Sequence, residues 1–151
     1  MERIASFCVD HTKLEKGVYV SRIDGDITTY DIRMRKPNVE QVLENSAIHT
    51  IEHLFATYAR NCEYKDQVIY FGPMGCRTGC YFLTRNLDNA TVLNIIKEAF
   101  AFIADFQGEI PGNSAVECGN YRDHDLALAK REAVEFMKIL KPLSEKDMQY
   151  M

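Results

Sequence analysis

The chain has 151 residues, of which 46% are hydrophobic and 26% charged, a balance typical of a folded protein rather than a disordered one. This length fits one domain that spans residues 1–151 around one core. The net charge of -4 argues against a non-specific nucleic-acid surface, which needs clustered cations to neutralise phosphates. The one dense basic run is Arg33-Met34-Arg35-Lys36, which we expect to form a solvated strand end with one arginine available to an anion.

Membrane spans and disulfides are also not expected from this sequence. No apolar stretch approaches the roughly 20 residues that a membrane span requires, and the N-terminus lacks the long apolar core of a signal peptide. We therefore expect a cytoplasmic protein without membrane contact. The five cysteines are odd in number and irregularly spaced, which argues against a disulfide framework. In a reducing compartment each of them is a small buried residue, a metal ligand or a reactive thiol.

The first predicted elements are a hairpin and a helix. Residues 18–23 and 27–33 are rich in β-branched and aromatic side chains, and the Asp-Gly-Asp segment between them is a good hairpin signal. Apolar residues then recur at helical spacing over about residues 45–61. Asn45 or Ser46 is the expected N-cap of this helix.

The rest of the chain predicts two more strands and two more helices. Four strands and three main helices, without regular alternation, predict an α+β fold: an antiparallel sheet of about four strands covered by helices on one face. A fourth short helix among the loops remains open. The later elements are strands at 67–71 and 80–84, a helix from Asp88 or Asn89 to about 106, a loop at 108–120 and a helix at about 123–140.

Two of the four histidines, His49 and His53, are four residues apart in the first predicted helix. On a helix this spacing places both imidazoles on one face, one turn apart, within reach of one metal ion. Glu52 lies near the same face and can act on a metal-bound group without being a ligand. The pattern His-x-x-Glu-His is the inverted form of a metalloprotease motif. The alternative is a pair of surface histidines, but the helix is otherwise apolar, and we predict a metal site.

The third ligand of this site is not fixed by spacing. A catalytic metal centre typically has three protein ligands and one open position. Cys118 lies in a glycine-containing loop that can fold over the helix, and a thiolate bound to a cation is deprotonated. His124 is the competing third ligand, although a single histidine equally fits a helix start or a neighbour of the ligands. Composition does not choose between them.

Cys76 is a second cysteine with possible chemistry. It lies in Pro73-Met74-Gly75-Cys76-Arg77-Thr78-Gly79, where glycines on both sides allow a tight turn close to a ligand. The neighbouring Arg77 would favour the thiolate, which is the reactive form. The alternative is a buried turn cysteine, and the residues alone leave both interpretations open. Cys80, on the following strand, is expected in the core.

Five segments together resemble one family, the S-ribosylhomocysteine lyases or LuxS enzymes. They occur in the order of that family, and the length of the chain is typical of it. The segments are Ser6 to Thr12, Tyr30 to Arg33 with Pro37-Asn38, His49 to Leu54, Pro73 to Gly79, and Cys118-Gly119 followed by His124-Asp125-Leu126.

The resemblance implies a metal-dependent lyase that cleaves S-ribosylhomocysteine to homocysteine and 4,5-dihydroxy-2,3-pentanedione, the precursor of autoinducer-2. Proton transfers move the substrate's carbonyl group along the opened ribose, and β-elimination then expels homocysteine. Such a reaction serves quorum sensing or the activated methyl cycle. The resemblance also implies a homodimer of α+β subunits with each active site at the subunit interface.

Carried onto this sequence, the resemblance makes His49, His53 and Cys118 the ligands of one Fe(II) per subunit, for which zinc or cobalt can substitute. The ligand types alone would not name iron. The metal would act as a Lewis acid on oxygen atoms of the substrate. Cys76 and Glu52 match the two acid/base groups that the proton transfers need.

The resemblance further implies four substrate-binding residues, and the chain departs from the family pattern at several positions, among them residues 70–72. Ser6, Phe7 and His11 would bind substrate across the dimer interface, and Arg33 would hold the catalytic thiolate or substrate hydroxyls. Where the family commonly has Asp, one residue and then Ser, this chain has Tyr70-Phe71-Gly72. This departure affects fine substrate contacts and removes none of the expected ligands or acid/base groups.

Two rival functions use the same motif. In an inverted-motif metalloprotease, Glu52 would activate a metal-bound water, but that class uses a distant Glu as third ligand and much longer chains. A storage or structural metal-binding module would need a closed site with four protein ligands. The sequence offers no convincing fourth ligand, so we expect the lyase.

Overall fold

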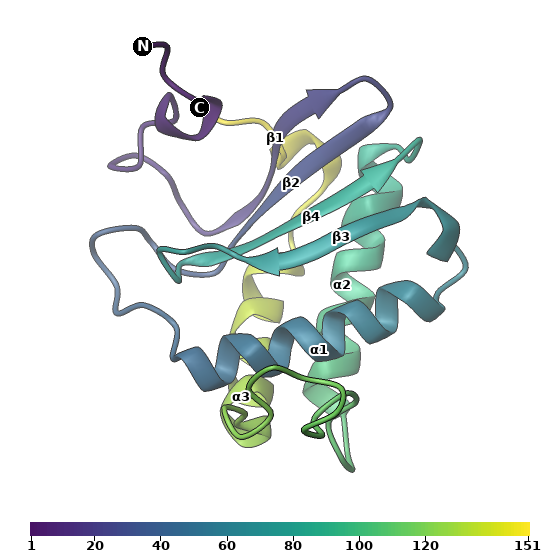
Figure 1. Cartoon of the computed structure of the whole chain (residues 1–151). Helices are drawn as coiled ribbons and strands as arrows, with labels where there is room; N and C mark the ends of the chain where they lie inside the picture. The colour runs from purple at the N-terminus through teal and green to yellow at the C-terminus, as the bar shows by residue number, and fades with distance from the viewer.

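A four-stranded antiparallel sheet is at the centre of the computed structural model, which describes residues 1–151 (Figure 1). Its strand order is β1-β2-β4-β3, so the last hairpin is added to β2 through β4. The strands are β1 (Gly17–Asp24), β2 (Ile27–Arg33), β3 (Val68–Pro73) and β4 (Gly79–Arg85). All three neighbouring pairs are antiparallel, which confirms the predicted sheet.

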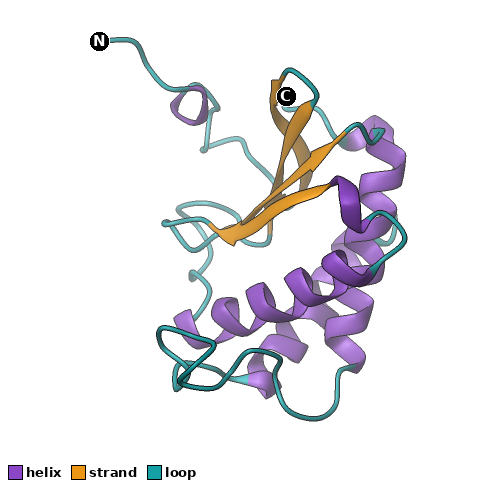
Figure 2. Ribbon diagram, turned by 45° about the vertical axis from the view of Figure 1, so that its right-hand side comes forward, coloured by secondary structure: helices purple, strands orange, loops and turns teal.

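Three α-helices lie on one side of this sheet, which confirms the α+β prediction (Figure 2). They are α1 (Asn45–Asn61), α2 (Asn89–Asp105) and α3 (Leu126–Leu140). The remaining helices are three short 3-10 turns at Ala5–Phe7, Lys65–Gln67 and Glu145–Asp147. No helix is long and apolar enough to cross a membrane.

The core lies between the sheet and the helices because side chains alternate across each strand. Tyr30 and Ile32 of β2 and Phe82 of β4 point toward the helices and are fully buried. Phe55 of α1 stacks on Phe71 of β3 at a ring separation of 3.9 Å. Burial of these aromatic rings fixes α1 against the sheet and so fixes the face that carries the two histidines.

Two helix starts differ from the predictions. The N-cap of α1 is Glu44, which makes no side-chain capping bond, rather than Asn45 or Ser46. Helix α3 begins at Leu126 instead of about residue 123, and Asp125 caps it by accepting a hydrogen bond from the Leu128 amide. The later start leaves residues 106–125 as one long loop. That loop runs along α1 (Figures 1 and 2).

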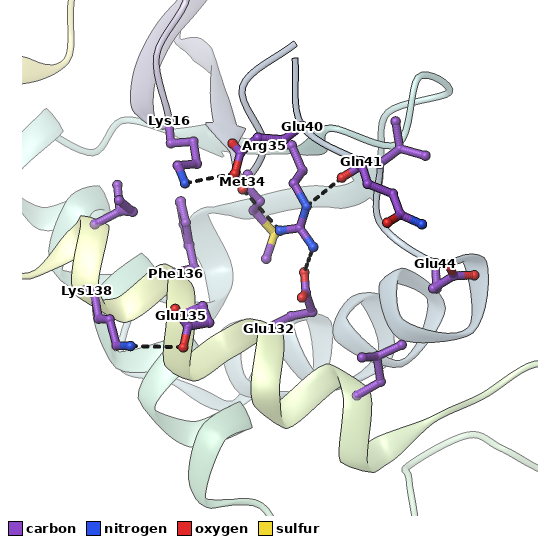
Figure 3. A pocket seen from close by; sticks show the side chains of 13 residues that line it. Lys16, Met34, Arg35, Glu40, Gln41, Glu44, Glu132, Glu135, Phe136 and Lys138 are labelled. Atoms are coloured by element: carbon purple, nitrogen blue, oxygen red, sulfur yellow. Dashed lines mark hydrogen bonds and ion pairs between the residues drawn. The ribbon is translucent and has the colours of Figure 1, made fainter. Parts of the chain in front are cut away.

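A cavity of about 590 Å³ lies between α3 and the segment that joins β2 to α1 (Figure 3). It contains none of the expected catalytic residues. Its basic side chains have acidic partners: Lys16 pairs with Glu40 and Lys138 with Glu135. We therefore infer that the paired side chains around this cavity support the segment that joins β2 to α1.

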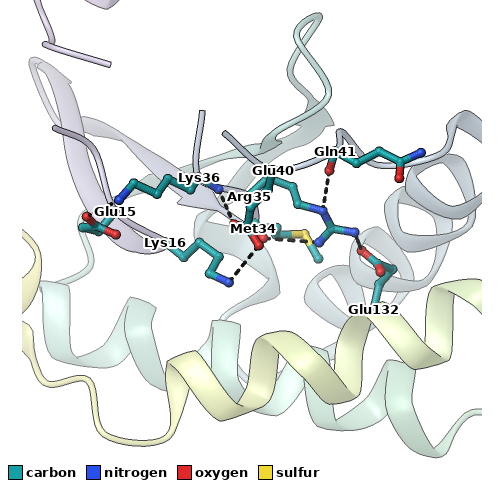
Figure 4. Close-up of polar contacts among 8 residues, drawn as sticks. All are labelled: Glu15, Lys16, Met34, Arg35, Lys36, Glu40, Gln41 and Glu132. Carbon is teal, nitrogen blue, oxygen red and sulfur yellow. Dashed lines mark hydrogen bonds and ion pairs between the residues drawn. The ribbon is translucent and has the colours of Figure 1, made fainter. Parts of the chain in front are cut away.

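The expected solvated basic run is instead a set of paired charges, so that prediction is wrong. Met34 is buried, and Arg35 donates to the Gln41 carbonyl at 2.8 Å and pairs with Glu132 of α3 (Figure 4). Lys36 pairs with Glu15 at 3.1 Å. These contacts hold the chain rigidly as it leaves Arg33, because each cation bridges to a different segment.

Candidate metal centre

His49 and His53 project from the same face of α1 toward the 106–125 loop. The Nδ1 atom of His49 lies 2.8 Å from the carbonyl oxygen of Asp123, and that of His53 lies 2.8 Å from the carbonyl oxygen of Pro111. A carbonyl oxygen only accepts, so both Nδ1 atoms carry the hydrogen and both Nε2 atoms present a lone pair. Hydrogen bonds from Nδ1 to a backbone carbonyl orient metal-binding histidines and fix their tautomer.

Cys118 lies against both lone pairs. Its Sγ atom is 3.4 Å from Nε2 of His49 and 3.9 Å from Nε2 of His53. Typical Zn–S and Zn–N bond lengths in a tetrahedral shell give a ligand separation of about 3.5 Å, close to these distances. The Asn120 amide donates a hydrogen bond to the same sulfur at 3.4 Å.

His124 also reaches this cluster, from the last residues of the loop before α3. The Thr50 hydroxyl donates its single hydrogen to the Ser46 carbonyl, so at 2.9 Å it accepts from Nδ1 of His124. Nε2 of His124 therefore bears a lone pair, is buried and has no hydrogen-bond partner. Burial and the nearby His49 and His53 lower the pKa of His124 to about 4, so the ring is neutral at neutral pH.

The four donor atoms lie within 4.8 Å of one another. Three imidazole lone pairs and one thiol that face a common point are a donor set suited to a divalent transition metal. The orphaned nitrogen of His124 supports the same conclusion, because a buried unpaired polar atom is costly unless something binds it.

The structure therefore brings together both candidates for the third ligand, Cys118 and His124. The expectation that the chain lacks a fourth donor is wrong. The sequence predicted His124 as a competing third ligand or as a residue at the start of the last helix. The late start of α3 at Leu126 leaves His124 in the loop and free to turn inward.

Glu52 lines a cavity of about 400 Å³ beside the cluster, together with His53, Arg60 and Tyr70. Arg60 donates to the backbone carbonyls of β3 and has no carboxylate partner. The Tyr70 ring lies over Gly72, where an added Cβ would stand 2.3 Å from the Tyr70 hydroxyl. Tyr70 thus forms part of the cavity wall, and a side chain at residue 72 would displace its ring.

Cys76 lies on the exposed turn between β3 and β4, apart from the cavity-lining residues around Glu52. Its Sγ atom is 3.1 Å from the Thr78 hydroxyl, which accepts a hydrogen bond from Arg33 at 2.9 Å. The turn adopts a positive φ at Arg77 (59°) rather than at a glycine. The cation linked to Cys76 is therefore Arg33, and no hydrogen bond or ion pair joins Cys76 to Arg77. Cys80 is buried in the core as expected, and burial raises the pKa of its thiol.

The N-terminal candidates lie elsewhere in the chain. Ser6 and Phe7 belong to the first 3-10 turn, and Phe7 is 64% exposed. His11 contacts only the Val9 carbonyl through Nδ1. This segment lies on the side of the sheet opposite α1 in both views (Figures 1 and 2). A single chain therefore does not bring Ser6, Phe7 or His11 to the histidine cluster.

Comparison with known proteins identifies the family to which this chain belongs. The model of the S-ribosylhomocysteinase (LuxS) family matches residues 4–146. The chain belongs to this family. It is 50% identical to an S-ribosylhomocysteine lyase of Desulfotalea psychrophila, 48% to one of Porphyromonas gingivalis and 46% to one of Borrelia garinii subsp. bavariensis. Each comparison covers 99% of this chain and 99% of the relative.

Proposed function

We propose that this LuxS-family member is a carbon–sulfur lyase that converts S-ribosylhomocysteine to homocysteine and 4,5-dihydroxy-2,3-pentanedione. The observation that carries the proposal is a half-buried cluster of three imidazoles and a thiol inside a chain matched over residues 4–146 by that family. The reaction needs no oxidant and no second substrate. It needs protons removed from carbon next to a carbonyl group and returned nearby, followed by loss of the thiolate.

The proposed ligands are His49, His53 and Cys118, because the Cys118 sulfur lies 3.4 and 3.9 Å from the Nε2 atoms of the two histidines. His124, whose donor atom lies within 4.8 Å of the other three, would then be free to accept a hydrogen bond from substrate. A bound divalent metal would supply Lewis-acid polarisation of substrate oxygens. We propose Fe(II), one per subunit, with zinc or cobalt able to replace it, since this donor set accommodates all three.

Glu52 and Cys76 are the proposed acid/base pair. Glu52 is half-buried and lines the cavity next to His53, where it would face a substrate bound beside the cluster. Cys76 is exposed on its turn and can approach a substrate from a different side. Two bases on different sides allow a proton to leave one carbon and return at the next. Arg33, linked to Cys76 through Thr78, would support the thiolate.

We also propose a homodimer in which the N-terminal segment of one subunit completes the active site of the other. The proposal is supported by the separation of Ser6, Phe7 and His11 from the histidine cluster within one chain (Figure 1). Phe7 is a large apolar side chain without a buried partner, which fits a contact with a second subunit. The five unpaired cysteines fit a reducing, cytoplasmic location.

The decisive experiment measures homocysteine release from S-ribosylhomocysteine by the metal-loaded protein with a thiol-reactive dye. Glu52→Gln and Cys76→Ala should each keep bound metal and lower kcat by about 10²-fold or more, because each loses a proton-transfer group. Cys62→Ala, which changes a half-buried thiol at the end of α1, is the matched control. Wild-type turnover by Cys76→Ala would reject its assigned role. Peptide cleavage without thiol release would instead favour the metalloprotease.

A further inference from the structure

The last residues of the chain return to the sheet and pack beside β1 (Figure 1). Met148 is fully buried, and its carbonyl oxygen accepts a hydrogen bond from the Val20 amide at 2.7 Å. Two residues later, the Tyr150 ring stacks on Tyr19 with centroids 5.1 Å apart. The penultimate side chain is therefore held in place by the core and by β1.

Tyr150 uses this position to contact a buried ion pair. Its hydroxyl donates to Oδ2 of Asp31 at 2.6 Å. The same carboxylate accepts two bonds from Arg33, at 2.6 Å on Oδ2 and 3.1 Å on Oδ1, and the Asp31 and Arg33 side chains are 1% and 3% exposed. Burial and then the Asp31 charge raise the pKa of Tyr150, so the phenol keeps its hydrogen and acts as a donor.

Arg33 continues the connection toward Cys76. Its remaining Nη1 group donates to the Thr78 hydroxyl at 2.9 Å, and that hydroxyl lies 3.1 Å from the Cys76 sulfur. A continuous series of polar contacts thus runs from the penultimate residue through Asp31, Arg33 and Thr78 to the proposed catalytic thiol.

We propose that Tyr150 is a positioning residue for Cys76, acting through Asp31, Arg33 and Thr78. An Arg–Asp pair by itself has no net charge and gives little support to a nearby thiolate. A phenol that donates to the carboxylate takes up part of its negative charge, so more of the Arg33 charge is available to the thiolate. The proposal rests on the role assigned to Cys76 above.

The same tail lines a cavity together with the N-terminal segment. A cavity of about 260 Å³ is lined by Tyr150 and Tyr19 together with Cys8 and Val9, which directly follow Ser6 and Phe7. Tyr150 therefore lies between the segment expected to bind substrate and the ion pair behind Cys76. This location allows one side chain to set the geometry of both.

The test compares Tyr150→Phe with wild type and with Gln149→Ala, an exposed residue of the same tail. The phenylalanine keeps the stack on Tyr19 and removes only the hydroxyl. We expect kcat to fall about 3- to 10-fold with KM nearly unchanged, as for loss of one charge-assisted hydrogen bond acting indirectly. In substrate-free protein, alkylation of Cys76 by iodoacetamide, followed by peptide mass spectrometry, should slow by a similar factor relative to Cys62.

The possible outcomes distinguish a failure of the Tyr150 proposal from a failure of the proposed function. If wild type releases no homocysteine, the proposed function fails, and the alkylation rates still test the coupling of Tyr150 to Cys76. If wild type is active and Tyr150→Phe matches it in kcat and in Cys76 alkylation, the positioning role is overturned. A lower melting temperature without a change in Cys76 alkylation would make Tyr150 merely structural and would also overturn the inference.

Discussion

The metal cluster and the Cys76 region are built in opposite ways. His49, His53, Cys118 and His124 converge within one chain, and each histidine has its Nδ1 atom fixed by a hydrogen bond. Cys76 lies on an exposed turn, and its supporting groups come from β2, the turn itself and the C-terminus. The first region is assembled by a helix and one loop. The second depends on segments that meet only in the finished fold, and the proposed partner subunit would complete it.

The difference shows which part of such a site a single chain can preorganise. Helix spacing and second-shell carbonyls are sufficient to direct several lone pairs at one point. The substrate side needs groups on different sides of a carbon chain, and a helix face cannot supply them. Variants in the two regions should therefore fail in different ways.

The largest effect is expected from removing a ligand. Cys118→Ala should weaken metal affinity by at least about 100-fold, since two of three proposed ligands remain. Metal content by mass spectrometry and competition with a chelating dye measure the change. His124→Ala is the informative comparison and should retain one metal per chain. Equal loss in both variants would instead indicate a closed four-ligand site, such as a structural metal-binding module would have.

The second prediction tests completion of the site by the partner. Glu52→Gln and His11→Ala proteins should each be nearly inactive. When equal amounts are unfolded and refolded together, about a quarter of wild-type activity should return, because half of the dimers are mixed and each has one intact site. Refolding each variant alone is the control. If mixing restores nothing, Glu52 and His11 do not act together across an interface.

The smallest effect concerns the loop behind His53. A Cβ at Gly112, where φ is +72°, would stand 3.3 Å from the His53 Nδ1 atom that donates to Pro111. Gly112→Ala should weaken metal affinity about 10-fold, as for other losses of second-shell support. Gly108→Ala is the control, because it has a positive φ in the same loop but no neighbour within 4 Å. An equal loss of metal affinity in the two variants would show that backbone strain, and not the contact with His53, causes the effect.

The sequence predicted the elements well because their signals are local. The hairpin around Gly25, the apolar face of α1 and the cap at Asp88 all depend on neighbours within a few residues. The His49–His53 pair was predictable for the same reason. The inward turn of His124 was not, because it depends on a hydrogen bond to Thr50, 74 residues away.

The Cys76 region was predicted only in part because its contacts come from residues that are far away in the sequence. Arg77 follows Cys76 in sequence and looked like its cation, but the structure links the thiol to Arg33 through Thr78. The Tyr150 contact joins residues 119 positions apart, and no pattern of spacing encodes it. Side chains from distant segments meet because the sheet brings their strands together, and periodicity does not report such meetings.

The pairing of Tyr70 with Gly72 has a consequence for inhibitor selectivity and for the evolution of this cavity. The Tyr70 phenol stands where a side chain at residue 72 would be. A side chain can therefore be introduced at residue 72 only if the Tyr70 ring moves or is replaced. A compound shaped against an aspartate and a serine at these positions would meet an aromatic wall in this enzyme. Ligands with a flat apolar group directed at Tyr70 should therefore distinguish this protein from one that has other residues at these two positions.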